Sequence, residues 1–123
     1  RGGGRVLSQR ADNILAVYPA ALSAVKAARR AQQFLKKDNA KRPPSDRFHL
    51  CIGIDAGPVL ALSDDVFGAA VNIASKIGED LAEKNEILLS GEVVHRLAGR
   101  IRSSYARSTQ IGGRLFELHR CAP

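Results

Sequence analysis

Residues 65–76, Asp65-Val-Phe-Gly-Ala-Ala-Val-Asn-Ile-Ala-Ser-Lys76, decide how this chain is interpreted, and Ile-Gly-Glu-Asp80 follows them directly. An acidic residue and a glycine turn lead into apolar positions that recur at helical spacing, which predicts a helix over 67–82. Asn72 and Lys76 are four residues apart, so they share one face of that helix. The expected buried stripe consists of Ala70, Val71, Ala74, Ile77 and Leu81.

The segments that precede this helix predict strands and a second helix. Residues 5–18 are expected to form a β-hairpin around Ala11-Asp12-Asn13, because Asp and Asn tolerate the positive φ of tight turns. Pro19 ends the hairpin, and regular apolar spacing predicts a helix over 20–37. A buried-type strand over 48–54 follows, and residues 59–62 are expected to return as its partner.

The segments after the helix predict the rest of a sheet. We expect a strand over 86–89, Ser90 as the N-cap of a helical turn over 92–97, and a final pair of strands over 101–107 and 115–119. The order predicts one α+β domain over 1–123 with a ferredoxin-like, mostly antiparallel mixed sheet and helices on one face. In this arrangement the 5–18 hairpin pairs with the 48–54 strand, and both long helices share one core.

Composition limits the function classes. The chain has 123 residues and a formal net charge of +7, but its basic residues are dispersed and only six aromatic residues are present (two Tyr and four Phe). Nucleic-acid binding is therefore less favoured than the alternative, a solvated basic face that can also touch an acidic partner. No apolar run is long enough to span a bilayer. Cys51 and Cys121 do not suggest a disulfide framework, so a reduced intracellular compartment is expected.

Four segments together resemble the catalytic domain of the class III nucleotidyl cyclases, the adenylate and guanylate cyclases. They are the 65–76 stretch, the hairpin around Asp12, the strand and turn Ile52-Gly-Ile-Asp-Ala-Gly57, and the strand Glu86-Ile-Leu-Leu-Ser90. The resemblance implies the cyclase fold. It also implies conversion of ATP or GTP into a 3′,5′-cyclic nucleotide and pyrophosphate, with Mg²⁺ or Mn²⁺, in intracellular signalling.

The resemblance also assigns roles to individual residues. Asp12 takes the place of one of two metal-binding aspartates, and its alternative role is to form the turn beside Asn13. Asp65 takes the position that reads the purine edge, and its alternative role is to cap the following helix.

Within the predicted helix, the resemblance places Asn72 where the family orients the ribose. Lys76 stands where the family has the arginine that stabilises the transition state. The alternative for Lys76 is a solvent-exposed lysine, and an ion pair with Asp80 is available to it at the same four-residue spacing.

The sequence departs from the family pattern at several positions. The purine-reading lysine is Ser8, and Lys76 keeps the charge of the family arginine but loses its bidentate fork. Arg114 is at best a loose substitute for a phosphate-binding lysine. Nothing corresponds to the first strand of the family, which carries the other metal-binding aspartate, or to the helices after it. Either they belong to residues outside this chain, which is then part of a longer protein, as we expect, or the protein has lost them. His49, His95 and His119 lack metal-ligand spacing.

Two functions remain open. One is an active cyclase domain that pairs head to tail with a second cyclase-type domain, so that Asp12 of one protomer faces Asn72 and Lys76 of the other. The other is a silent cyclase-homology module that acts as a structural or dimer-partner domain. We expect the isolated chain to have little or no activity.

Overall fold

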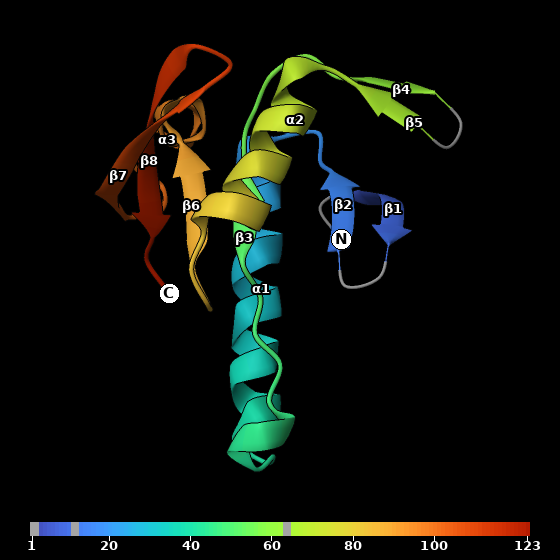
Figure 1. Cartoon of the computed structure of the whole chain (residues 1–123), viewed down its shortest axis with the longest axis vertical. Helices are drawn as coiled ribbons and strands as arrows, with labels where there is room; N and C mark the ends of the chain where they lie inside the picture. The colour runs from blue at the N-terminus through green and yellow to red at the C-terminus, as the bar shows by residue number, and fades with distance from the viewer. Residues whose placement is uncertain (1–2, 11–12, 63–64) are drawn as a thin grey trace.

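A computed structural model describes residues 3–10, 13–62 and 65–123, with residues 7–10 described by their backbone. Figure 1 shows the arrangement of the helices and strands, and the bounds follow in chain order. The elements are β1 Arg5–Arg10, β2 Asn13–Val17, α1 Ala21–Asn39, the 3₁₀ turn η1 Pro44–Asp46, β3 Ile52–Ile54, β4 Leu60–Leu62, β5 Asp65–Phe67, α2 Ala69–Lys76, the π-helical turn η2 Ile77–Leu81, β6 Ile87–Ser90, α3 Gly91–Leu97, β7 Ser103–Ile111 and β8 Arg114–Cys121.

The central sheet has the strand order β3-β6-β8-β7 in the described chain. β3 pairs with β6 in parallel, whereas β6–β8 and β7–β8 are antiparallel. The expected C-terminal hairpin is confirmed, and Gly112 and Gly113 both have positive φ at its turn, as two-residue hairpin loops require. The mixed, mostly antiparallel character of the predicted sheet is also confirmed.

Apolar side chains cover both faces of this sheet. On one face Val25 and Ala28 of α1 and Val93 of α3 pack against Ile87 and Leu89. On the other face Ile73 and Ile77 pack against Leu88, Phe116 and Leu118. The alternation along β6 explains the division, because successive side chains of a strand point to opposite faces.

The prediction that the long helices share one face is therefore wrong. α1 lies on one side of the sheet, whereas α2 and η2 lie on the other. The physical reason is that every residue of β6 is buried, so both faces of this strand need an apolar cover. The expectation of a single core overlooked that Ile87-Leu88-Leu89 is apolar without alternation.

The hairpin prediction is half right. β1 and β2 do pair with each other, but they form a separate two-stranded sheet, and β3 pairs with β6 instead. In Figure 1 the hairpin lies on one side of α1 and strands β6, β8 and β7 on the other. Its position depends on contacts with remote segments, namely β5 and η2, and local alternation cannot encode such contacts.

A second hairpin projects from the end of the molecule (Figure 1). β4 pairs with β5 rather than with β3, so the predicted return strand over 59–62 has a different partner. Residue 67 ends β5 and does not begin a helix. The helix begins after Gly68, whose φ of 145° favours glycine, and a Cβ there would lie 2.6 Å from the Pro58 carbonyl oxygen.

The remaining local predictions agree with the structure in kind but differ in their bounds. The strand expected over 48–54 is β3, which begins only at Ile52, and the strand expected over 101–107 is β7, which extends to Ile111. The helix expected over 20–37 is α1, which ends at Asn39. Ser90 caps α3 as predicted, because its hydroxyl oxygen accepts a hydrogen bond from the Val93 backbone N–H (3.3 Å). None of the helices in the described ranges is long and apolar enough to cross a membrane.

Candidate functional site

The outward face of α2 carries two of the predicted site residues. Ala70 and Ile73 of this helix and Ile77 just after it are buried, whereas Asn72 and Lys76 are exposed on the opposite side. Asn72 and Lys76 therefore point away from the core of their own domain. The buried stripe differs in part from the predicted one, because Ile73 takes the place of Val71 and Ala74.

Lys76 is paired within the chain. Its ammonium Nζ lies 2.9 Å from Asp80 Oδ2, and the two side chains are 52% and 51% exposed. The ion pair that competes with a role in phosphate binding therefore forms. The lysine stem is not buried, however, and an exposed i,i+4 pair contributes only about 0.3–0.5 kcal/mol. Lys76 can exchange this carboxylate for another anion at small cost.

Asp65 is the first residue of β5 and is exposed. Its Oδ1 accepts a hydrogen bond from the Val66 backbone N–H (3.0 Å). Asp65 does not cap α2, because the N-cap is Gly68 and no side chain accepts a hydrogen bond there. The exposure of Asp65 leaves its carboxylate free to meet a ligand, and the alternative of a helix cap is wrong.

Asp12, the predicted metal ligand, lies outside the described residues, as do residues 63 and 64 at the other hairpin tip. Its neighbour Asn13 donates a hydrogen bond from Nδ2 to Glu79 Oε1 (3.3 Å). This end of the first hairpin therefore lies close to η2 of the same chain. Within the described ranges no three His, Cys, Asp or Glu side chains gather in a way that could hold a metal ion, so these ranges by themselves do not form a metal centre.

A close crossing of β3 and η2 positions α2 on the sheet. A Cβ at Gly53 would overlap the Gly78 backbone nitrogen and lie 2.6 Å from the Ala74 carbonyl oxygen. Glycine is therefore required at this point, because the two backbones touch. A glycine inside a strand pattern, such as Gly53, is the sequence signal of this kind of close backbone approach.

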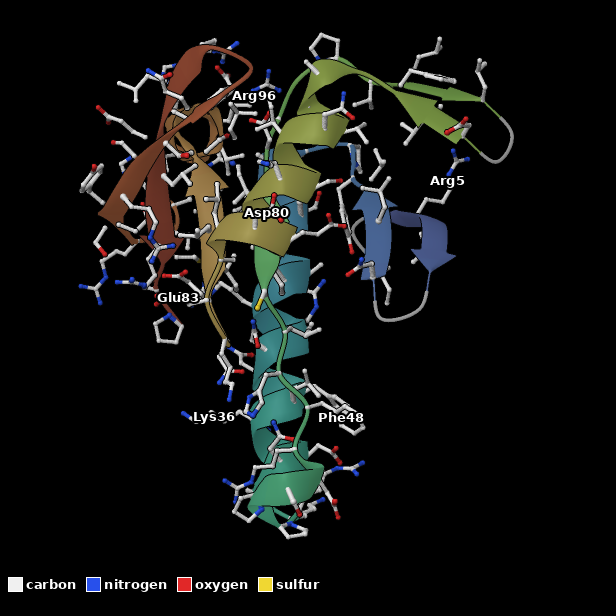
Figure 2. The ribbon with its side chains drawn as sticks, viewed as in Figure 1. Arg5, Lys36, Phe48, Asp80, Glu83 and Arg96 are labelled. Carbon is white, nitrogen blue, oxygen red and sulfur yellow. The ribbon has the colours of Figure 1, made fainter. Side chains whose placement is uncertain are left out.

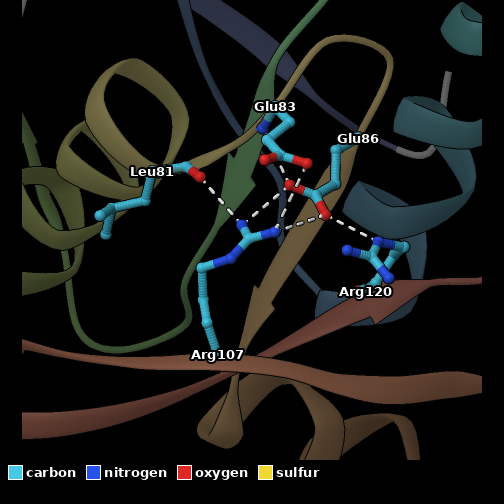
Figure 3. Close-up of polar contacts among 5 residues, drawn as sticks. All are labelled: Leu81, Glu83, Glu86, Arg107 and Arg120. Carbon is cyan, nitrogen blue, oxygen red and sulfur yellow. Dashed lines mark hydrogen bonds and ion pairs between the residues drawn. The ribbon is translucent and has the colours of Figure 1, made fainter.

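The most buried charge in the described chain belongs to Glu86, just before β6 (Figure 3). Arg107 holds it with two hydrogen bonds, Nη1 to Oε1 (2.9 Å) and Nη2 to Oε2 (3.1 Å). Arg120 Nε donates to Oε2 (2.7 Å), and Arg107 Nη1 also donates to the Leu81 carbonyl oxygen (2.9 Å). The network joins β6, β7, β8 and the end of η2.

The arginines set the ionisation of Glu86. Burial by itself would raise the pKa of this carboxyl, but the hydrogen bonds from Arg107, the Glu83 backbone N–H and Arg120, together with the charge of Arg107, lower it to about 2. The side chain is only 4% exposed, and it remains a carboxylate in all but strongly acidic solution. In the sequence, Glu86 is recognisable only as the first residue of the expected 86–89 strand, because its arginine partners lie 21 and 34 positions away.

The weaker candidates do not form a site. His49 Nδ1 lies 3.0 Å from Asn85 Oδ1, while His95 belongs to α3 and His119 to β8. The guanidinium of Arg114 lies 4.4 Å from the centre of the Phe116 ring. Ser8 is described by its backbone alone.

A comparison with protein families matches the chain to the adenylate and guanylate cyclase catalytic domain over residues 7–117. One curated protein of Rhizobium meliloti (strain 1021), named "Putative adenylate cyclase 3", is 30% identical over 97 residues. That match covers 79% of this chain, and the chain spans only 16% of the length of that relative.

Solved structures share the fold. The adenylate/guanylate cyclase/hydrolase from Silicibacter pomeroyi superposes with a TM-score of 0.89 at 24% identity, over 99% of this chain and 74% of the other. The guanylate cyclase domain of RhGC from Catenaria anguillulae, solved in complex with GTP, superposes with a TM-score of 0.77 at 16% identity, over 98% and 72%. The predicted α+β nucleotide cyclase fold is thereby confirmed.

Proposed function

The chain belongs to the adenylate and guanylate cyclase catalytic domain family, and from that premise we propose that it takes part in converting ATP or GTP into a 3′,5′-cyclic nucleotide and pyrophosphate. The observation that carries the proposal is the outward face of α2. There Asn72 and Lys76 are exposed one turn apart, so both can reach a ligand that lies outside the domain.

Each proposed residue has a separate task. In the reaction the ribose 3′-oxygen loses its proton and attacks the α-phosphorus, and the bond to the pyrophosphate oxygen breaks. The Asn72 amide can hold the ribose by hydrogen bonds, and the Lys76 ammonium can stabilise the charge that develops on the phosphorus oxygens. Asp65 can accept a hydrogen bond from the exocyclic amine of the purine.

We further propose that the site is completed by a second cyclase-type domain in a head-to-tail dimer. Asp65, Asn72 and Lys76 all face away from the core, and the projecting β4–β5 hairpin exposes the apolar side chains of Leu60, Leu62 and Phe67. Exposed apolar groups gathered on one projecting element are typical of a surface that another protein covers. A partner on that side would also exclude water from the substrate.

Of the proposed site, the metal-binding part is supported by one residue, Asp12. Asp12 would supply one hard oxygen ligand, which suits Mg²⁺ or Mn²⁺, and when bound such an ion would neutralise phosphate charge. Among the described residues no three His, Cys, Asp or Glu side chains gather around one point, and we assign no step of the reaction to the ion.

A silent, structural or dimer-partner role is the second candidate. The pairing of Lys76 with Asp80 favours it, as do Ser8 at the purine-reading position and the lysine that replaces an arginine. In this case the fold would be retained for its interface, and the nucleotide would bind weakly or not at all.

Nucleotide binding separates the two candidates. Fluorescent ATP and GTP analogues are titrated with the chain over a range of protein concentrations, because a site shared by two protomers binds better as the dimer fills. Asn72→Ala and Asp65→Ala should each weaken binding by about fivefold or more, the effect of one hydrogen bond to a ligand. Gln110→Ala, an exposed amide on β7, is the control and should leave binding unchanged. An absence of binding, or equal binding by all four proteins, would favour the silent module.

A further inference from the structure

An open groove of about 980 Å³ lies beside α1, at the end of the sheet where β6 begins and β8 ends. One wall is the second half of α1, and the other is formed by the segment before β6 and by the end of β8. Leu35, Ile87 and Cys121 are among its apolar lining residues. Figure 2 labels Lys36 and Glu83, which belong to the two walls.

The groove carries an excess of positive charge. Its cationic lining residues are Arg29, Lys36, Arg47, Lys84 and Arg120. The two lining carboxylates are Glu83 and Glu86. Glu86 is already bound by Arg107 and Arg120, so its charge is offset inside the fold. The same pairing engages Arg120, and the excess of positive charge therefore rests on Arg29, Lys36, Arg47 and Lys84. Glu83 lies 3.8 Å from Arg107 and is 77% exposed.

At one end of the groove, the side chain of Arg29 has one nitrogen without a hydrogen-bond acceptor among the described residues. Its Nη2 donates to the Pro123 oxygen (2.8 Å), but its buried Nε has no acceptor among the described residues. A buried donor of a charged group without an acceptor is unfavourable. A small rotation of the guanidinium toward an acidic ligand would give this donor a partner.

The cations are spread along the groove rather than gathered at one point. Arg29 and Lys36 are seven residues apart on α1, which corresponds to about 10 Å along the helix axis. At the far end Arg47 is fixed by hydrogen bonds from its Nε to the carbonyl oxygens of Asn39 and Arg42. A single phosphate group needs converging donors, whereas carboxylates spaced along an extended chain match separated cations.

We propose that this groove binds an acidic segment of a partner polypeptide, with its side-chain carboxylates against the cations of α1 and the opposite wall. The apolar lining accommodates the carbon stems of the bound segment. Because no residue of α2 lines the groove, this contact leaves the outward face of α2 free for nucleotide.

The test uses a fluorescein-labelled hexaglutamate peptide and fluorescence anisotropy at low salt. Lys36→Glu combined with Lys84→Glu reverses two exposed charges of the groove. The matched control is Lys37→Glu combined with Lys41→Glu, two exposed lysines outside the groove. Both double variants change the net charge equally, so they separate a local contact from general attraction.

We expect the groove variant to bind the peptide about tenfold more weakly, the effect of two lost exposed ion pairs, and the control variant to bind within about twofold of the unchanged chain. Asn72→Ala should bind it normally, which separates this proposal from the nucleotide site. Equal weakening in both double variants, or no binding to the unchanged chain, would overturn the proposal. So would displacement of the peptide by equimolar inorganic tripolyphosphate, because the groove would then prefer a compact anion.

Discussion

The ion pairs around Glu86 and the ion pair between Lys76 and Asp80 lie in two different regions of the molecule. Glu86 is buried between β6, β7 and β8, and two arginines hold it with hydrogen bonds of 2.7–3.1 Å. Lys76 and Asp80 are close at 2.9 Å, but both are about half exposed. Similar distances therefore describe interactions of very different strength.

The difference indicates which charges maintain the fold and which are available for a ligand. A buried carboxylate cannot lose its partners without leaving unpaired charges inside the protein. An exposed pair loses little when it opens, because water replaces each partner. The charges near β6 thus stabilise the sheet, whereas the charges on α2 can serve the proposed site.

Replacing Glu86 should have the largest effect on stability. Glu86→Gln should lower the free energy of unfolding by about 3 kcal/mol, because Arg107 and Arg120 lose their counter-charge. This value is at the low end of the range for buried pairs, since Arg120 is 49% exposed. Urea unfolding monitored by circular dichroism measures the change.

Glu83→Gln is the control for that experiment. Glu83 is 77% exposed and lies 3.8 Å from Arg107, so the expected change is less than about 0.5 kcal/mol. Equal stability of Glu86→Gln and Glu83→Gln would show that the hydrogen bonds of Glu86 with Arg107 and Arg120 do not stabilise the sheet.

The same network predicts how stability depends on pH. The pKa of Glu86 is about 2 in the folded chain, below its ordinary value of 4.5. Its contribution is present above pH 4.5 and is lost as the pH falls toward 2. This loss amounts to at most about 3 kcal/mol. Urea unfolding at pH 5, 4, 3 and 2 should show this dependence in the unchanged chain and a flatter one in Glu86→Gln. Parallel curves would contradict the prediction.

Replacing Gly53, where β3 and η2 cross, should have the next largest effect on stability. Gly53→Ala places a methyl group against the backbone of Ala74 and Gly78, and overpacking of this kind costs about 1–3 kcal/mol. Gly57→Ala is the control, because its added Cβ would lie at an ordinary 3.5 Å from the Ala70 side chain. Thermal unfolding should separate the two variants, and equal midpoints would show that β3 and η2 can move apart freely.

Removing the exposed ion pair between Lys76 of α2 and Asp80 of η2 should have the smallest effect on stability. Asp80→Ala should change the free energy of unfolding by less than about 0.5 kcal/mol. The substitution also releases Lys76, so nucleotide binding should stay the same or strengthen. A loss of more than about 1 kcal/mol in the same urea measurement would mean that this pair belongs to the structural charges.

The sequence was sufficient for much of the fold because several of its signals are local. The apolar spacing of α1, the Ser90 cap and the glycine turn of the last hairpin each depend on neighbouring residues. The two-faced core has a weaker signal, the three successive apolar residues Ile87, Leu88 and Leu89. Such a run is consistent with a strand covered on both faces, but periodicity alone does not distinguish it from other buried segments. In the structure Leu88 faces away from Ile87 and Leu89.

The candidate site was predicted less completely. Helical spacing was enough to place Asn72 and Lys76 on one exposed face, because that relation lies within one element. The Glu86 network joins residues 86, 107 and 120, and only the pairing of β6, β7 and β8 brings them together. The contact between Asn13 and Glu79 spans 66 positions, and it likewise has no local signal.

The central claim is that Asp65, Asn72 and Lys76 of one chain face outward and do not form a complete catalytic site by themselves. The most direct test measures cyclic nucleotide formed from ATP and from GTP by the isolated chain with excess Mn²⁺, beside Asp12→Ala. We predict a rate close to background for both proteins. A single missing charge-stabilising group can lower the rate by about a hundredfold or more, and such losses are not simply additive. Clear turnover by the isolated chain at concentrations at which it is monomeric, lost in Asp12→Ala, would contradict the claim.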